Sequence, residues 1–200
     1  MASFQGIGSS LVVGRKMRAS IPKAKEWPII QIIGLPGAGK TTLGKKLAKK
    51  FKLPTYRIGT YRSKFPLSAE GEADTWVALF RDLSKHGWKN CILETSGLNA
   101  RECFLRGAFP FLRIITIKLV CQRKVLYSRI NKKAKKEKGT EWLFSPSFHD
   151  KYEFTKKMFK HFKNTTAEIT IDTTRLDPTQ VFKTALKKIK NFMNKGLLSF

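Results

Sequence analysis

Long apolar runs are missing from this sequence of 200 residues. No stretch approaches the roughly 20 apolar residues that a membrane-spanning helix needs, so we expect a soluble protein. Cysteine is also sparse: Cys91, Cys103 and Cys121 are odd in number and lack C-x-x-C spacing. This pattern predicts neither a disulfide framework nor a zinc site. It is typical of a reducing compartment, and we therefore expect a cytoplasmic location.

Acidic residues are scarce as well. The chain has 14 Asp and Glu against 40 Lys and Arg, which gives a formal net charge of +26. Such a charge attracts nucleic acid, anionic membranes or phosphorylated substrates. A lysine-rich proteome would explain it equally well, because the lysines are spread along the chain without the arginine–aromatic interleaving of single-strand binders. Nucleic acid is therefore a candidate partner only, and the oligomeric state is left open.

The beginning of the chain differs in composition from the rest. It contains several cations, Ser and Gly, and no acid before Glu26. We expect residues 1–26 to be a flexible basic tail and residues 27–200 to form one domain. An organellar transit segment is the alternative, whereas the apolar residues 11–13 are too few for a secretory signal.

A phosphate-binding loop is the most informative feature present. Residues 34–42 fit the pattern G-x-x-x-x-G-K-[ST], between an apolar β-prone run (29–33) and a helical pattern (42–51). Strand, glycine loop and helix together point backbone N–H groups at a phosphate. We expect a nucleoside triphosphate, with Lys40 reaching its β- and γ-phosphates and the Thr41 hydroxyl ligating Mg²⁺. The expected nucleotide-binding residues are Gly34, Leu35, Pro36, Gly37, Ala38, Gly39, Lys40, Thr41 and Thr42.

Strand and helix patterns alternate along the remaining chain. Further strands are expected at 54–58, 90–94, 113–120 and 168–171, and helices at 68–87, from 123, at 150–163 and from 177. Residues 60–69 show no clear period and are expected to be a loop. Alternation of this kind predicts a single three-layer α/β/α domain with a five-stranded parallel sheet, and a ligand at the carboxyl ends of the strands.

The chain from residue 29 onward resembles the P-loop kinase superfamily, and within it the small kinases related to polynucleotide kinase. Asn131-Lys132-Lys133-Ala134 lacks the aspartate of a guanine-reading motif, which argues against a GTPase. The resemblance is carried by the phosphate loop and by four other segments. These are Tyr61-Arg62, Ile92–Asn99 with Arg101, Val125–Arg129, and Ile171–Thr174 before Asp177-Pro178.

The resemblance implies roles for residues outside the loop. Glu94 lies where the family carries an acid that holds Mg²⁺ or acts as general base, and the sequence leaves these two roles open. Arg129 lies at the base of the family's mobile lid, here expected at about 129–150. Arg57 and Arg62 follow the second strand, where these kinases bind the acceptor, and their charges suit an acceptor with a phosphate.

One difference from the family pattern affects the expected activity. Relatives of polynucleotide kinase carry a catalytic aspartate just before the Tyr-Arg pair, whereas this chain has Gly59-Thr60. The leading hypothesis is an ATP- and Mg²⁺-dependent kinase that phosphorylates a hydroxyl of a nucleic-acid 5′ end, a nucleotide or a small metabolite. The alternative is a non-catalytic ATP-binding module whose basic surface engages nucleic acid or an assembly.

Overall fold

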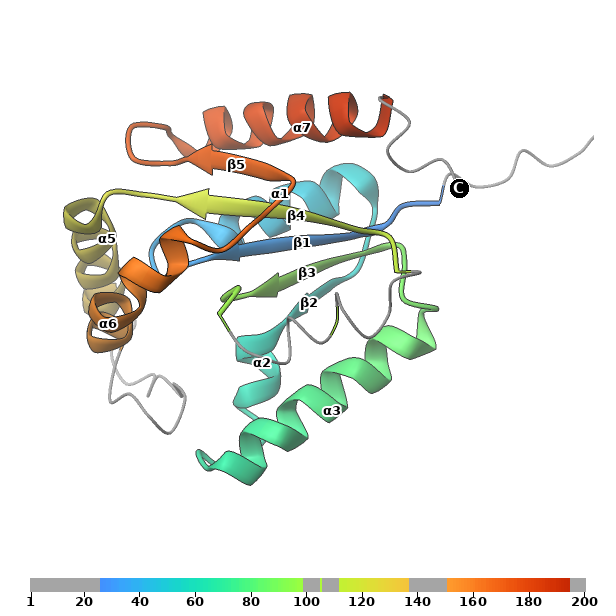
Figure 1. Ribbon diagram of the computed structural model, residues 1–200, viewed down its shortest axis with the longest axis horizontal. Coiled ribbons are helices and arrows are strands. Elements are labelled where there is room, and N and C mark those ends of the chain that lie inside the picture. Colours follow the sequence, from blue (N-terminus) through green and yellow to red (C-terminus); the bar gives the residue numbers. More distant parts are fainter. Residues whose placement is uncertain (1–25, 99–104, 106–111, 137–150, 195–200) are drawn as a thin grey trace, which may run out of the picture.

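The computed structural model describes residues 26–98, 105, 112–136 and 151–194. These residues form a five-stranded parallel sheet, with helices packed on both of its faces (Figure 1). The strand order is β2-β3-β1-β4-β5, so the strand that leads into the phosphate loop lies at the centre. The expected three-layer α/β fold is confirmed. Most of the expected basic tail (1–25) and of the lid (137–150) lies outside the described residues.

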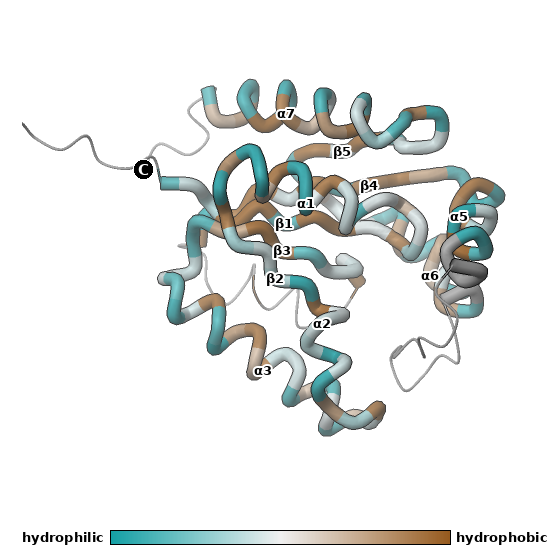
Figure 2. Tube along the Cα trace, turned by 180° about the vertical axis from the view of Figure 1, so that it is seen from behind, coloured by the Kyte–Doolittle hydropathy of each residue, from teal (hydrophilic) through white to brown (hydrophobic). Residues whose placement is uncertain are grey.

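The strands begin and end within about one residue of the predicted positions. They are β1 (Ile29–Gly34), β2 (Thr55–Arg57), β3 (Cys91–Thr95), β4 (Ile114–Val120) and β5 (Ile169–Asp172). All residues of β1 and β3 are buried, as expected for central parallel strands that are covered on both faces. Figure 2 shows the same property as an almost continuous hydrophobic colour along β1.

Two groups of helices cover the two faces of the sheet. The helices are α1 (Lys40–Phe51), α2 (Ile58–Arg62), α3 (Ala69–Lys85), α5 (Arg123–Lys136), α6 (Lys151–Lys163) and α7 (Pro178–Asn194). Leu47 of α1 and Ile189 of α7 are buried in one apolar cluster, and Trp76 and Leu79 of α3 in the other. α5 and α6 stand at the carboxyl ends of the strands (Figure 1). None of the helices in the described ranges is both long and apolar enough to span a membrane.

The expectation of a loop from residue 60 was wrong at its beginning, because α2 continues directly from β2 and ends at Arg62. Ile58 and Tyr61 of this short helix are buried in the cluster that contains Trp76 of α3. Tertiary packing therefore makes a helix from a segment too short to show a sequence period. The Tyr61 hydroxyl adds a hydrogen bond of 2.7 Å to Asp82 Oδ2 of α3.

A buried lysine joins β4 to the end of α6. The ammonium of Lys118 donates hydrogen bonds to the carbonyls of Lys163 (2.8 Å) and Thr165 (2.6 Å), and it lies 5.1 Å from the centre of the Phe162 ring. Burial lowers the pKa of this amine. Because the last carbonyls of a helix have no partner within it, Lys118 satisfies the carboxyl end of α6 from inside the sheet.

The bond between Tyr61 and Asp82 is expected to hold α2 on α3. Replacing Tyr61 by Phe should lower the free energy of unfolding by about 1 kcal/mol or less at neutral pH, because the hydrogen bond is lost at a half-exposed carboxylate. The bond also holds the pKa of Asp82 below its ordinary value, so its contribution is present above that value and is lost as the pH falls through the folded-state pKa.

Urea unfolding of both proteins across the acid range tests this expectation. The difference in unfolding free energy between wild type and Tyr61→Phe should shrink as Asp82 becomes protonated. Tyr56→Phe is the matched control, since the Tyr56 hydroxyl makes no hydrogen bond to another described residue. A difference that stays constant down to pH 2, on the order of two units below an ordinary carboxyl pKa, would contradict the assignment.

Candidate functional site

The phosphate loop connects β1 to α1, and its glycines adopt conformations that other residues avoid. Gly37 and Gly39 have φ values of 79° and 97°. A Cβ on Gly37 would lie 2.9 Å from the carbonyl oxygen of Leu126, whereas a Cβ on Gly39 would meet nothing within 4 Å. Gly37 is therefore required both by its backbone angle and by the approach of α5, and Gly39 by its backbone angle alone.

The beginning of α1 is open to an anion. Its N-cap residue is Gly39, which supplies no side-chain hydrogen bond, and its first turn contains no acid. In contrast, Ser68 caps α3 and the Asp177 carboxylate accepts hydrogen bonds from the first N–H groups of α7. A glycine N-cap leaves the first N–H groups of α1 available, and the helix dipole makes this end favourable for a phosphate.

Lys40 lies folded over the loop that precedes it. Its ammonium donates hydrogen bonds to the carbonyls of Gly34 (2.7 Å) and Leu35 (3.3 Å). The side chain is therefore held beside the cradle of backbone amides. A rotation of this flexible side chain would bring its charge to a phosphate in the loop.

Thr41, Glu94 and Arg57 form a closed triangle of contacts next to the loop. The Thr41 hydroxyl donates to Glu94 Oε1 at 2.7 Å, and Arg57 Nε donates to Glu94 Oε2 at 3.1 Å. Arg57 Nη2 lies 3.3 Å from the Thr41 hydroxyl oxygen. Glu94 is 8% exposed, whereas the Arg57 side chain is 39% exposed. The buried carboxylate thus has a partner at each oxygen, and the cation is on the solvent side.

Arg129 of α5 approaches the loop from the other half of the sheet. Its guanidinium donates to the Thr173 carbonyl at 2.7 Å and to the Thr173 hydroxyl at 3.2 Å, and it lies 3.5 Å from the Gly37 carbonyl. Thr173 is 2% exposed and donates in turn to the Ala38 carbonyl at 3.3 Å. Arg129 therefore anchors α5 to the loop and to the end of β5.

Arg62 lies apart from the loop. It forms a two-pronged ion pair with Glu72, at 2.8 Å and 2.6 Å, and Glu72 also accepts from the Trp76 indole at 2.9 Å. Among the described residues, no contact joins Arg62 to the phosphate loop. The Arg62 guanidinium is therefore neutralised by a carboxylate of α3, and the Glu72 carboxylate is occupied by this ion pair. Asp74, another acid of α3, is exposed.

Thr41 and Glu94 are the residues that suit a magnesium ion. Within the described ranges, no group of three or more His, Cys, Asp or Glu residues could hold a metal by itself. Mg²⁺ in nucleotide sites commonly takes one or two protein oxygens together with phosphate oxygens and water. A hydroxyl and a carboxylate 2.7 Å apart at the mouth of the loop agree with that mode.

Two parts of the site were not predicted. Thr173 lies in a segment named in the resemblance, but no sequence pattern indicates that it bridges Arg129 and the loop. The triangle made by Arg57 also went unpredicted, since Arg57 was expected to face only the acceptor. The available signal is its position as the last residue of β2, because parallel strands end at the same edge.

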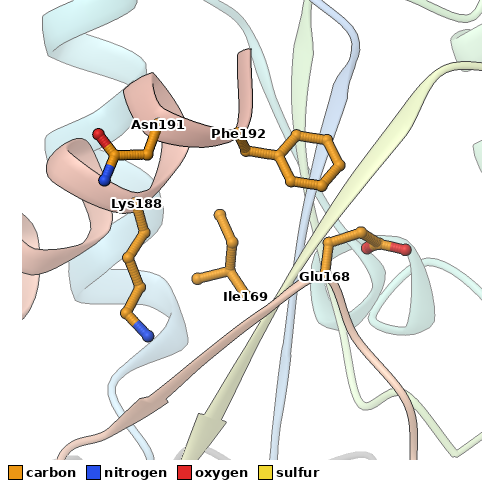
Figure 3. Close-up of a pocket in the computed structure, with 5 residues that line it drawn as sticks. All are labelled: Glu168, Ile169, Lys188, Asn191 and Phe192. Carbon is orange, nitrogen blue, oxygen red and sulfur yellow. The ribbon is translucent and has the colours of Figure 1, made fainter. Parts of the chain in front are cut away.

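A separate shallow pocket lies at the other edge of the sheet (Figure 3). It has a volume of about 200 Å³ and is lined by Glu168, Ile169, Lys188, Asn191 and Phe192. Ile169 begins β5, so the pocket is near the amino ends of the strands, away from the phosphate loop. Glu168 accepts a hydrogen bond from the Thr116 amide and Lys188 donates to the Thr170 carbonyl. Its charged groups thus take part in the fold.

The geometry defines a P-loop α/β fold, and comparison with solved structures shows the same fold in several kinases. A gluconokinase from Sinorhizobium meliloti 1021 superposes with a TM-score of 0.62 at 14% identity, over 86% of this chain and 98% of that chain. Shikimate kinase from Acinetobacter baumannii, in complex with shikimate, gives 0.57 at 18% identity, over 86% and 96%. The APS kinase of Mycobacterium tuberculosis, in complex with AMPPNP and APS, gives 0.55 at 10%, over 84% and 99%.

Similarity at the level of sequence is lacking. No protein-family model and no curated protein sequence matches the chain. The likeness to these kinases is therefore one of fold, and the residues of the site have to be argued from their own geometry.

The two glycines with positive φ in the phosphate loop are expected to respond differently to substitution. Gly39→Ala should cost roughly 1–2 kcal/mol of unfolding free energy, because only its backbone angle is strained. Gly37→Ala should cost more, because its methyl group would also press on the Leu126 carbonyl. Chemical denaturation of both variants measures the difference. An equal loss in the two would show that α5 does not approach Gly37 as described.

Proposed function

We propose that this protein is a kinase that transfers the γ-phosphoryl group of ATP to a hydroxyl group of an anionic acceptor. The contact between Thr41 and Glu94 at the mouth of the phosphate loop carries the proposal, because it places a hydroxyl and a buried carboxylate where a nucleotide-bound Mg²⁺ would be held. A P-loop in a fold shared with gluconokinase, shikimate kinase and APS kinase supports it.

The chain's own cations suit phosphoryl transfer, which depends mainly on positioning and on neutralising negative charge. Lys40 would bind the β- and γ-phosphates together with the amides of the loop. Arg129, 3.5 Å from the Gly37 carbonyl, would contribute its charge from the opposite side of the loop. Bound Mg²⁺ would neutralise phosphate charge, with Thr41 and Glu94 as its protein oxygens.

The proposal of an anionic acceptor is based on the side chain of Arg57. Arg57 ends β2, on the acceptor side of these folds, and its exposed portion faces solvent beside Glu94. Released from Glu94, its guanidinium would bind a carboxylate or phosphate of the acceptor in a two-pronged way. Arg62, which is paired with Glu72, would serve by orienting α2 and α3 around the acceptor.

Glu94 could also receive the proton of the acceptor hydroxyl, since Gly59 and Thr60 provide no carboxylate. A phosphoryl transfer with a loose transition state needs little help from a base. The non-catalytic alternative follows from the same departure at Gly59-Thr60 and predicts nucleotide binding without transfer to any acceptor.

Replacing Lys40 by Ala tests the site. Transfer of labelled γ-phosphate should fall by about 100-fold or more, because a charge that stabilises the transition state is removed. ATP affinity should weaken, whereas thermal stability should remain close to wild type. Lys85→Ala, an exposed lysine on α3, is the control and should leave transfer intact.

The acceptors for this assay are a 5′-hydroxyl RNA, nucleoside monophosphates and small hydroxy acids. Transfer that survives Lys40→Ala would refute the site. ATP binding that depends on Lys40, without transfer to any of these acceptors, would favour the non-catalytic alternative.

Arg57 contacts the Thr41 hydroxyl and the Glu94 carboxylate, the two groups proposed to hold the metal, so we expect the two cations to compete. Arg57→Gln should lower the Mg²⁺ concentration required for half-maximal nucleotide binding by about 3- to 10-fold, because a partly exposed charge next to Glu94 is removed. Glu94→Gln should raise that concentration. Titration of a fluorescent ATP analogue with Mg²⁺ measures both effects without turnover.

Arg81→Gln, an exposed arginine on α3, controls for the loss of one positive charge. If Arg57→Gln weakened nucleotide binding equally at every Mg²⁺ concentration, Arg57 would be a nucleotide ligand. Competition with the metal would then be wrong.

A further inference from the structure

The helices α1 and α7 carry many lysines and no carboxylate. Beyond Lys40, α1 has four lysines, and α7 has four more, while neither helix contains Asp or Glu. All except the half-buried Lys46 are exposed. We call this surface the lysine face; it consists of Lys45, Lys46, Lys49, Lys50, Lys183, Lys187, Lys188 and Lys190.

The two helices form one continuous surface. They lie next to each other over the same face of the sheet (Figures 1 and 2). Lys46 of α1 donates a hydrogen bond of 3.3 Å to Thr179 of α7, and its ammonium lies 5.8 Å from the centre of the Phe182 ring. The lysines of α1 and α7 therefore contribute to a single positive field.

The opposite face of the molecule has a different charge pattern. Helix α3 carries Glu70, Glu72, Asp74 and Asp82 among its 17 residues, together with the cations Arg81 and Lys85. A general enrichment in lysine would not separate the charges by face. The layer of α1 and α7 thus lacks the helical carboxylates of the α3 layer; α5, at the carboxyl ends of the strands, is basic as well, with seven Lys and Arg and no acid.

The spacing of the lysines forms rows. Lys45 and Lys49, and likewise Lys183 and Lys187, are four residues apart, which places their charges about 6 Å apart along each helix. Like charges at this spacing destabilise a helix. The helix dipole favours cations only near a carboxyl end, as for Lys49 and Lys50, and does not account for Lys183. Repulsive rows on two adjacent helices suit a long anion with regularly spaced charges better than a single phosphate.

We infer that the lysine face binds the phosphate backbone of a nucleic acid, without reading its sequence. A membrane surface is less suitable, because the large apolar side chains that are exposed in the described ranges, Leu67 and Val77, belong to α3 or the segment before it. The lysine face thus presents no large apolar side chain for insertion between lipids. It also presents no exposed aromatic platform for stacking bases, which favours recognition of the backbone alone.

This surface is distinct from the proposed transfer site. The lysine face begins beyond the first turn of α1 and extends over α7, whereas Arg57 and Glu94 lie at the ends of β2 and β3. A bound nucleic acid would therefore hold the protein without being its phosphoryl acceptor. The inference does not rest on kinase activity.

Binding of a fluorescent RNA oligonucleotide to the full chain, measured by anisotropy over a range of salt concentrations, tests the inference. The variant combines Lys45→Gln, Lys49→Gln, Lys183→Gln and Lys187→Gln. We expect its affinity to fall by about 10-fold or more, and the slope of log affinity against log salt to become shallower by about 3, as for the loss of four phosphate contacts.

The matched control removes four exposed cations from the opposite side: Lys64→Gln, Arg81→Gln, Lys85→Gln and Lys89→Gln. It lowers the net charge equally and should lose much less affinity. ATP binding should be unchanged in both variants, which separates this result from the outcome for the transfer site. Equal losses in the two variants, or a flat salt dependence for wild type, would overturn the inference. Binding to phosphatidylserine vesicles but not to RNA would overturn it in favour of a membrane.

Discussion

The pairing of Arg57 with Glu94 across two parallel strands is the constraint on which the site is built. In the register of β2 and β3 these residues are direct neighbours, and Glu94 is also paired with Ile32, two residues before Gly34. The backbone hydrogen bonds of the sheet thus bring a cation, a carboxylate and the loop to one edge. The side chains of Glu94 and Arg57 are therefore close enough for both to contact the Thr41 hydroxyl. Because the sheet is buried, this alignment is rigid.

The other half of the sheet provides support of a different kind. β4 and β5 end beside the loop, and Thr173 follows β5 so that its buried hydroxyl contacts the Ala38 carbonyl. Arg129 is held by Thr173, and Lys118 holds the end of α6. Arg129 and Lys118 are therefore anchored to backbone carbonyls, whereas Arg57 is anchored to a carboxylate. Carbonyl anchors carry no net charge, so Arg129 retains more of its positive field than Arg57 does.

Much of the fold was predictable because its signals are local. The apolar run at 29–33, the glycine loop and the alternation of periods indicated the parallel sheet, and Glu94 was identified from its place at the end of a buried strand. The helix α2 was missed because five residues cannot show a period; tertiary contacts, among them those with Trp76 and Asp82, stabilise it. The roles of Thr173 and Arg57 were missed because they depend on register between strands distant in the chain. The ion pair of Arg62 with Glu72, which also accepts a hydrogen bond from the Trp76 indole, likewise depends on how two helices meet.

The position of β2 has an evolutionary consequence. It is a three-residue strand at the edge of the sheet, and among the described residues it pairs with β3 alone, whereas β1 is held from both sides. Mutations that lengthen, twist or replace this edge would leave the nucleotide cradle undisturbed while changing which charge stands opposite Glu94. For a kinase of the proposed kind, acceptor choice could therefore diverge through the edge of the sheet, and a descendant could acquire a new substrate without first losing its old phosphate donor.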